Sequence, residues 1–247
     1  MFGSVRNRGA AGSVCVAMTL ELPALRPLGP ARLSVEPHTA HPAYATLLAD
    51  AATTGSCPVW VSERGLQMLE PPRDPHAVLA EVASRDAATF LDERWPSDCP
   101  QCGCRDSFGS FTGLAPALVP EDDPVAVAAE SEIASRRSHL ALVPGIRPAD
   151  AVAVLRWRGT CNRHDDVAGL SAVLRSWEER FGALLVQIDF MTLWLTVAAP
   201  PRTPQECRAV AAEHFAFCPD VDGEDPRALR DYAATLAGRR WWRFWWD

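Results

Sequence analysis

The chain has 247 residues, of which 48% are hydrophobic and 22% are charged, and its formal net charge is −7. This composition excludes wholesale disorder, because it supplies enough apolar residues to form a core. No apolar run approaches the roughly 18 residues that a membrane-spanning helix requires, and no basic stripe marks a nucleic-acid-binding surface. We therefore expect neither a membrane nor a nucleic acid as a partner.

Residue usage is strongly biased. All 24 basic residues are arginine, and asparagine and isoleucine are scarce. GC-rich codons account for this bias, so we expect a bacterial protein from a GC-rich genome. The lack of lysine excludes Schiff-base and P-loop lysine chemistry. Eight cysteines are present, but residues 1–20 lack a clear secretory signal and Met18 is an alternative start, so we expect a cytoplasmic protein with reduced thiols.

The first part of the chain predicts an irregular segment followed by a small subdomain. Residues 1–40 are rich in proline and glycine and lack sustained periodicity. A helix is expected from about Tyr44 to Ala52, before a strand over Pro58–Ser62. These elements begin an N-terminal α/β subdomain over residues 41–96.

A second helix of this subdomain is expected after Asp74 and Pro75, a pair typical of an N-cap and a first helical turn. The apolar spacing that follows predicts a single helix ending near Trp95. Residues 97–136 include a stretch rich in Pro, Gly, Ser, Asp and Cys, so we expect a linker there.

Residues 137–247 predict a second domain with alternating strands and helices. The elements in chain order are a strand over His139–Pro144, a helix from Asp165 or Asp166 to Gly182, strands over Ala183–Asp189 and Thr192–Ala198, a helix from Thr203 to Phe217, a helix beginning at Asp225-Pro226, and a strand over Trp241–Trp246. In the second of these strands, alternation places Leu184, Val186 and Ile188 on one face.

This order matches a split β-α-β unit with one additional helix. We therefore predict an α+β fold in which the C-terminal domain has a four-stranded, ferredoxin-like antiparallel sheet with helices. We predict that the N-terminal α/β subdomain is the smaller of the two units.

Several segments of the C-terminal half lie in a distinctive order along the chain, and they are Ser171–Gly182, Ala198–Pro201, Ala211–Asp220, Tyr232-Ala233 and Trp242–Asp247. Together they resemble a known family, the bacterial domain of unknown function 4253. The resemblance covers roughly His139 to Asp247, and Gly55–Trp60 resembles a segment that often precedes the domain. The family implies no established activity, so it assigns no catalytic residue.

Three cysteines suggest a metal site. Cys99, Cys102 and Cys104 include a C-x-x-C pair, which matches half of a tetrahedral zinc site. His214 and Cys218, one helical turn apart, are candidates to complete it. The alternative is a cysteine-rich loop without metal, because the chain has no second C-x-x-C motif.

A second cluster suggests catalysis. Glu213 beside His214 is a pattern that orients a general base, Cys218 is a candidate nucleophile, and Asp220 follows. The alternative is that His214 and Cys218 are core residues, and the residue types favour this interpretation.

The final strand suggests a contact surface. Alternation sends Trp242 and Trp246 to one face and Trp241 and Trp245 to the other. If the sheet is covered on one side, Trp241 and Trp245 are exposed and form a binding site.

These observations lead to one functional hypothesis with two alternatives. We expect a non-catalytic protein-interaction module that binds or neutralises a protein partner and needs no cofactor. The alternatives are a small enzyme using the cluster around His214, or a structural module stabilised by zinc.

Overall fold

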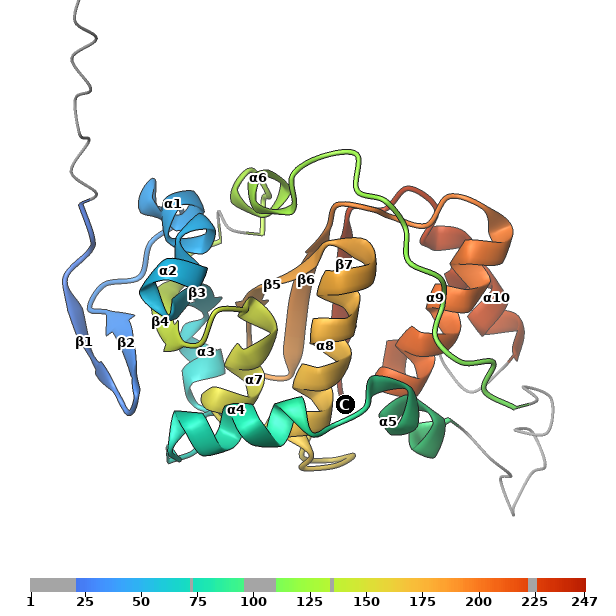
Figure 1. The fold of residues 1–247 in the computed structure, drawn as a ribbon, viewed down its shortest axis with the longest axis horizontal. Helices are drawn as coiled ribbons and strands as arrows, with labels where there is room; N and C mark the ends of the chain where they lie inside the picture. The colour runs from blue at the N-terminus through green and yellow to red at the C-terminus, as the bar shows by residue number, and fades with distance from the viewer. Residues whose placement is uncertain (1–20, 72, 96–109, 134–135, 222–225) are drawn as a thin grey trace, which may run out of the picture.

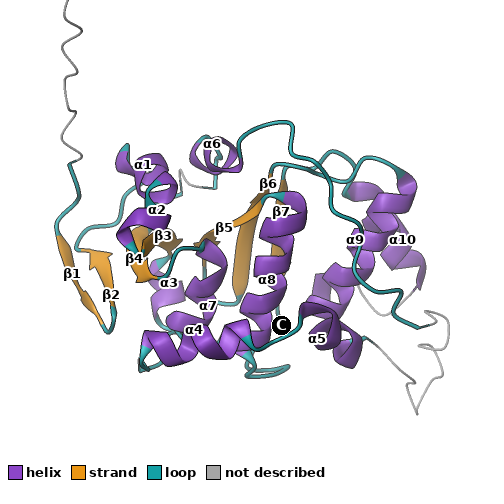
Figure 2. Ribbon diagram, in the orientation of Figure 1, coloured by secondary structure: helices purple, strands orange, loops and turns teal. Residues whose placement is uncertain are grey.

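The computed structural model describes residues 21–71, 73–95, 110–133, 136–221 and 226–247, which form a seven-stranded sheet with helices on both faces (Figures 1 and 2). The strands run in the spatial order β1-β2-β4-β3-β5-β6-β7. Their bounds are Leu25–Leu28 for β1, Ala31–Ser34 for β2, Ser56–Val61 for β3, His139–Pro144 for β4, Ala183–Ile188 for β5, Thr192–Val197 for β6 and Trp241–Trp245 for β7. Neighbours in this sheet are antiparallel except β3 and β5, which are parallel.

Strand β3 comes from the N-terminal part of the chain but lies between two C-terminal strands. It pairs antiparallel with β4 along its whole length, and its last residues, Trp60 and Val61, pair with β5. Pro58 is tolerated in this central strand because the pairing with β5 begins at Trp60. The predicted α+β class is confirmed, but the four-stranded ferredoxin-like sheet is wrong, because β4 and β5 are separated by β3 and the sheet is larger.

A hairpin occupies part of the segment that was expected to be irregular. Strands β1 and β2 pair with each other, and β2 continues the sheet by pairing with β4. Gly29 adopts a positive φ of 57° in the turn between them, a conformation that glycine tolerates readily. The two strands are too short to give a clear alternation, and tertiary pairing stabilises them.

The N-terminal helices are shorter than the sequence predicts. Their bounds are Ala43–Ala49 for α1, Ala51–Thr54 for α2, Glu63–Leu66 for α3, Pro75–Ala83 for α4 and Ala87–Arg94 for α5. The single helix expected up to Trp95 is two helices, because Asp86 caps α5 by accepting a hydrogen bond from the Thr89 N–H at 2.7 Å. A further helix, α6 over Pro124–Ala129, lies within the predicted linker.

The C-terminal helices follow the sequence signals closely. Their bounds are Pro148–Asp150 for the 3₁₀ turn η2, Ala151–Val154 for α7, Val167–Phe181 for α8, Pro204–Phe217 for α9, Pro219–Val221 for η3 and Pro226–Thr235 for α10. Asp166 caps α8, Gly182 ends it with a φ of 55°, and Thr203 and Glu206 form the predicted capping box of α9. The helix signals after residue 160 are therefore confirmed.

The sheet has one core on each face. Helices α8 and α9 contribute to the larger core, whereas α1, α2 and α6 pack over the inner strands on the opposite face. A bulge between Leu185 and Gln187 shifts the alternation of β5, so Ile188 lies in the core of Leu185 and not in that of Leu184 and Val186. Among the described residues, no helix combines the length and apolar character needed to cross a membrane.

The position of β3 predicts that the C-terminal segment does not fold by itself. A fragment of residues 137–247 lacks the strand that satisfies backbone groups of both β4 and β5. We expect this fragment to lack a cooperative unfolding transition by circular dichroism, and co-expression with residues 1–136 to restore one. A cooperative transition in the isolated fragment would contradict the structure.

Candidate functional site

On the sheet face opposite α8, helix α6 packs on β5 and β6, whereas side chains of the edge strand β7 are exposed. The register pairs Thr192 with Trp245, Trp194 with Arg243 and Thr196 with Trp241, so these six side chains share that face. The other face of β7 carries Trp242, Phe244 and, beyond the strand, Trp246, which are buried. The predicted alternation of the tryptophans is confirmed, and Trp241 and Trp245 are 42% and 41% exposed.

Arginines pack on two of the indoles that share this face, Trp194 and Trp241. The ring centroids of Trp194 and Trp241 are 5.7 Å apart. The guanidinium carbons of Arg136 and Arg243 lie 3.9 and 5.5 Å from the Trp194 ring centroid, and that of Arg239 lies 4.7 Å from the Trp241 centroid. These are cation–π distances. We call this group the Trp–Arg surface, and its members are Trp194, Trp241, Trp245, Arg136, Arg239 and Arg243.

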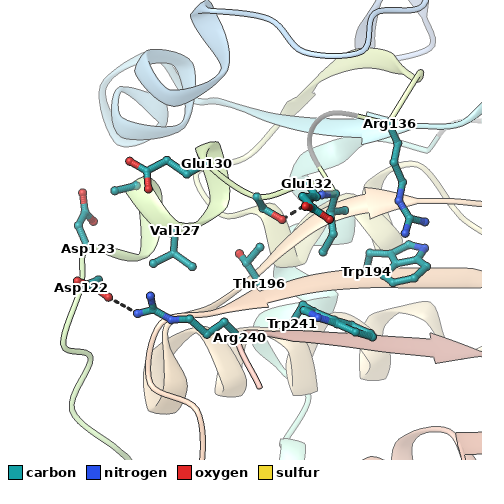
Figure 3. A pocket seen from close by; sticks show the side chains of 13 residues that line it. Asp122, Asp123, Val127, Glu130, Glu132, Arg136, Trp194, Thr196, Arg240 and Trp241 are labelled. Atoms are coloured by element: carbon teal, nitrogen blue, oxygen red, sulfur yellow. Dashed lines mark hydrogen bonds and ion pairs between the residues drawn. The ribbon is translucent and has the colours of Figure 1, made fainter. Parts of the chain in front are cut away.

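A hollow of about 750 Å³ opens beside the Trp–Arg surface, between α6 and the sheet (Figure 3). Trp194, Trp241 and Arg136 form one side of it. Asp123 and Glu130, which flank α6, make the opposite side acidic (Figure 3).

Fixed polar contacts shape this hollow. Asp122 forms an ion pair with Arg240 across it, and Asp123 caps α6 by accepting a hydrogen bond from the Val125 N–H at 3.1 Å. The hydroxyl of Thr196, at the base, is buried and makes no hydrogen bond with any described residue. The hollow therefore presents an aromatic and cationic wall, an acidic wall and a buried hydroxyl group.

Glu213, a predicted catalytic candidate, is fully buried in an ion pair. Its carboxylate accepts hydrogen bonds from both terminal nitrogens of Arg180 at 2.8 and 2.6 Å. It also accepts from the indole N–H of Trp177 at 2.8 Å and from the Ala115 N–H at 2.6 Å. Because both oxygens are occupied by these donors, Glu213 ties α9 to α8 and to the segment around Ala115.

His214 points into an aromatic core. Its Nδ1 lies 2.8 Å from the hydroxyl of Tyr232, and its ring packs edge-on against Trp242 with centroids 4.3 Å apart. Its Nε2 is buried and has no hydrogen-bond partner among the described residues. Burial, with a contribution from Arg180, lowers the pKa of His214 well below its usual value, so the ring is neutral at pH 7.

Cys218 and Asp220 have separate structural roles. The Cys218 thiol donates a hydrogen bond to the Trp245 carbonyl, and burial raises its pKa. A buried, protonated thiol is a poor nucleophile. Asp220 forms an ion pair with Arg163 and accepts a hydrogen bond from the Asp247 N–H at 3.2 Å. These contacts favour a structural over a catalytic role for the whole predicted cluster.

The predicted zinc ligands Cys99, Cys102 and Cys104 lie outside the described residues. Within the described residues, no group of three or more His, Cys, Asp or Glu side chains is arranged to hold a metal ion. Zinc binding by the three cysteines therefore stays a prediction.

The sequence predicts Trp241 and Trp245 as contact residues but does not indicate the rest of the Trp–Arg surface. Leu193 and Leu195 of β6 are buried in the larger core, and alternation along the strand directs Trp194 to the opposite face. The pairing of Trp194 with Arg243 and the approach of Arg136 depend on register and on a distant connection. No local signal in the sequence contains that information.

Comparison with family models finds one match. Residues 139–247 match the model of a domain of unknown function, DUF4253, which confirms the resemblance and its extent. Comparison with the curated proteins and with the solved structures gives no significant match.

Removing the Glu213 charge is expected to destabilise the fold. Glu213→Gln leaves the Arg180 guanidinium buried without a carboxylate partner, a change that costs about 3–5 kcal/mol of unfolding free energy. Glu179→Gln is the matched control, because Glu179 is exposed where it pairs with Arg147, and such pairs contribute about 1 kcal/mol or less. Urea unfolding measures both. Equal effects of the two substitutions would contradict the structural role of Glu213.

Acid is expected to destabilise the protein partly through His214. Because the pKa of His214 is lowered in the folded state, the unfolded chain binds more protons below about pH 6.5. The stabilising contribution of neutral His214 is therefore complete above pH 6.5 and is lost as the pH falls, by up to about 1.4 kcal/mol per pH unit. We expect His214→Phe to lose less stability than the wild type between pH 7.5 and pH 5 in urea unfolding. An unchanged pH dependence would be inconsistent with a buried neutral imidazole.

Proposed function

We propose that the protein is a non-catalytic binding module that holds a polypeptide partner on the Trp–Arg surface. The observation that supports this most directly is the exposure of Trp241 and Trp245 on β7, at the outer end of the sheet face that α1, α2 and α6 cover elsewhere. A soluble domain normally buries indoles of this size, so their exposure on a continuous surface favours an interaction site.

The chemistry of the surface is that of a protein interface. Tryptophan and arginine are enriched among the residues that contribute most to binding energy between proteins. Here the guanidinium groups of Arg136 and Arg239 pack on the rings of Trp194 and Trp241. Such packing restricts the rings before a partner arrives, which lowers the entropic cost of binding.

The adjoining hollow adds room for a projecting side chain. It adjoins Trp194 and Trp241, so a partner that packs on these rings reaches its opening. The buried Thr196 hydroxyl gives it a hydrogen-bonding group at the base. A binding role also fits the burial of His214 and Cys218, because neither is accessible to a substrate.

Removing the two exposed indoles is expected to abolish partner binding. In affinity capture from the native host followed by mass spectrometry, Trp241→Ser/Trp245→Ser is expected to lose the proteins recovered by the wild type. Ile146→Ser is the matched control, because Ile146 is also an exposed apolar residue but lies outside the Trp–Arg surface. Equal recovery by the wild type and the double variant would count against the proposed function.

A further inference from the structure

Strand β7 is an edge of the sheet, and its outward-facing backbone groups can be identified. The Val197 N–H donates to the Arg240 carbonyl, and the Trp246 N–H donates to the Met191 carbonyl. In an antiparallel ladder such bonded pairs alternate with non-bonded ones. The N–H and C=O groups of Trp241, Arg243 and Trp245 therefore point away from β6.

Part of this edge has no partner within the described residues. The Trp245 carbonyl accepts the Cys218 thiol, and η3 packs against this end of the strand. No hydrogen bond within the described residues uses the outward N–H and C=O groups of Trp241 and Arg243. An edge of this kind is a template for an additional strand.

The side chains beside this edge give it a positive local charge on an otherwise acidic protein. Arg136, Arg239 and Arg243 stack on tryptophans, and none of them forms an ion pair with a described residue. The acidic groups Glu130 and Glu132 line the hollow that Arg136 also lines, whereas Arg239 and Arg243 lie just before β7 and on β7 itself. Asp220, at the other end of β7, is paired with Arg163.

We propose that the edge of β7 binds an extended, acidic segment of a partner protein as an eighth strand of the sheet. The proposal rests on the proposed function and specifies the partner. The added strand pairs with the free backbone groups of Trp241 and Arg243. On the exposed face, it places an acidic side chain beside Arg243 and apolar side chains beside Trp241 and Trp245. The partner segment therefore needs an acidic residue with an apolar residue two positions before it and another two positions after it.

Two other occupants fit the observations less well. A second copy of the chain that pairs antiparallel about Arg243 places that arginine opposite its own counterpart, and like charges in that position are unfavourable. A nucleic acid would be repelled by the net charge of −7 on the chain and by the acidic residues along the neighbouring hollow. Charge therefore favours an acidic polypeptide over both.

The test uses two synthetic peptides with the full-length protein. One has the sequence Thr-Val-Thr-Glu-Thr-Val-Thr with blocked ends, and the other replaces Glu with Lys. We expect the acidic peptide to bind at least about tenfold more tightly than the basic one, as measured by NMR titration. We also expect it to slow hydrogen exchange of the Arg243 amide, which becomes hydrogen-bonded in the added strand.

Paired variants separate backbone pairing from charge. Arg243→Thr removes the guanidinium but keeps the outward N–H, whereas Arg243→Pro removes both. Proline is tolerated on an edge strand where the N–H faces solvent, so both variants are expected to fold, which circular dichroism checks. We expect Arg243→Thr to weaken binding of the acidic peptide and Arg243→Pro to weaken it further.

Four results would overturn the proposal. The first is that the protein binds the two peptides equally or binds neither, and the second is that the proline and threonine variants bind the acidic peptide equally. The third is a wild-type dimer that Arg243→Pro dissociates in sedimentation. The fourth is that the protein binds oligothymidylate more tightly than the acidic peptide. If one of them occurs while Trp241→Ser/Trp245→Ser still loses the captured proteins, strand addition is wrong and the proposed function stands.

Discussion

The backbone pairing of β3 with both β4 and β5 is the constraint on which the rest of the structure depends. It joins the N-terminal part of the chain to the segment that matches DUF4253, and it places a strand between two strands of that segment. Because α1 and α2 directly precede β3 in the chain, they pack on the inner part of one sheet face. Helix α6 packs beside α1 and covers β5 and β6, so the cover on this face ends before β7 and leaves Trp241 and Trp245 exposed.

The residues that look most reactive in the sequence are used for stability. Glu213 accepts hydrogen bonds from two side chains and one backbone amide, and His214 packs among Trp177, Trp242 and Phe244. These groups hold α9 against α8 and against the inner face of β7. Because buried and exposed residues alternate along β7, the strand that contributes Trp242 and Phe244 to this core presents Trp241 and Trp245 on its other face. The five residues of β7 therefore contribute both to the core and to the proposed binding surface.

Much of the C-terminal half could be predicted because its signals are local. Asp166 and Gly182 bound α8, and the capping box at Thr203 begins α9, as the chemistry of helix ends requires. The failures were of two kinds. The helix predicted up to Trp95 is divided at Asp86, a capping residue that the apolar spacing concealed. The predicted sheet was too small, since the hairpin of β1 and β2 carries too few residues for alternation to indicate its partner.

The sequence by itself determined which side chains alternate along β7 and where most C-terminal helices begin and end, because both depend on residues a few positions apart. It also determined the family resemblance of residues 139–247. Tertiary structure alone decided that β3 separates β4 from β5, that Arg136 lies on Trp194, and that Glu213 meets Arg180. These contacts join residues far apart in the chain, and they form only when strand order and register have been set. For that reason the candidate site was predictable as two tryptophans, whereas its arginines, its hollow and its free strand edge were not.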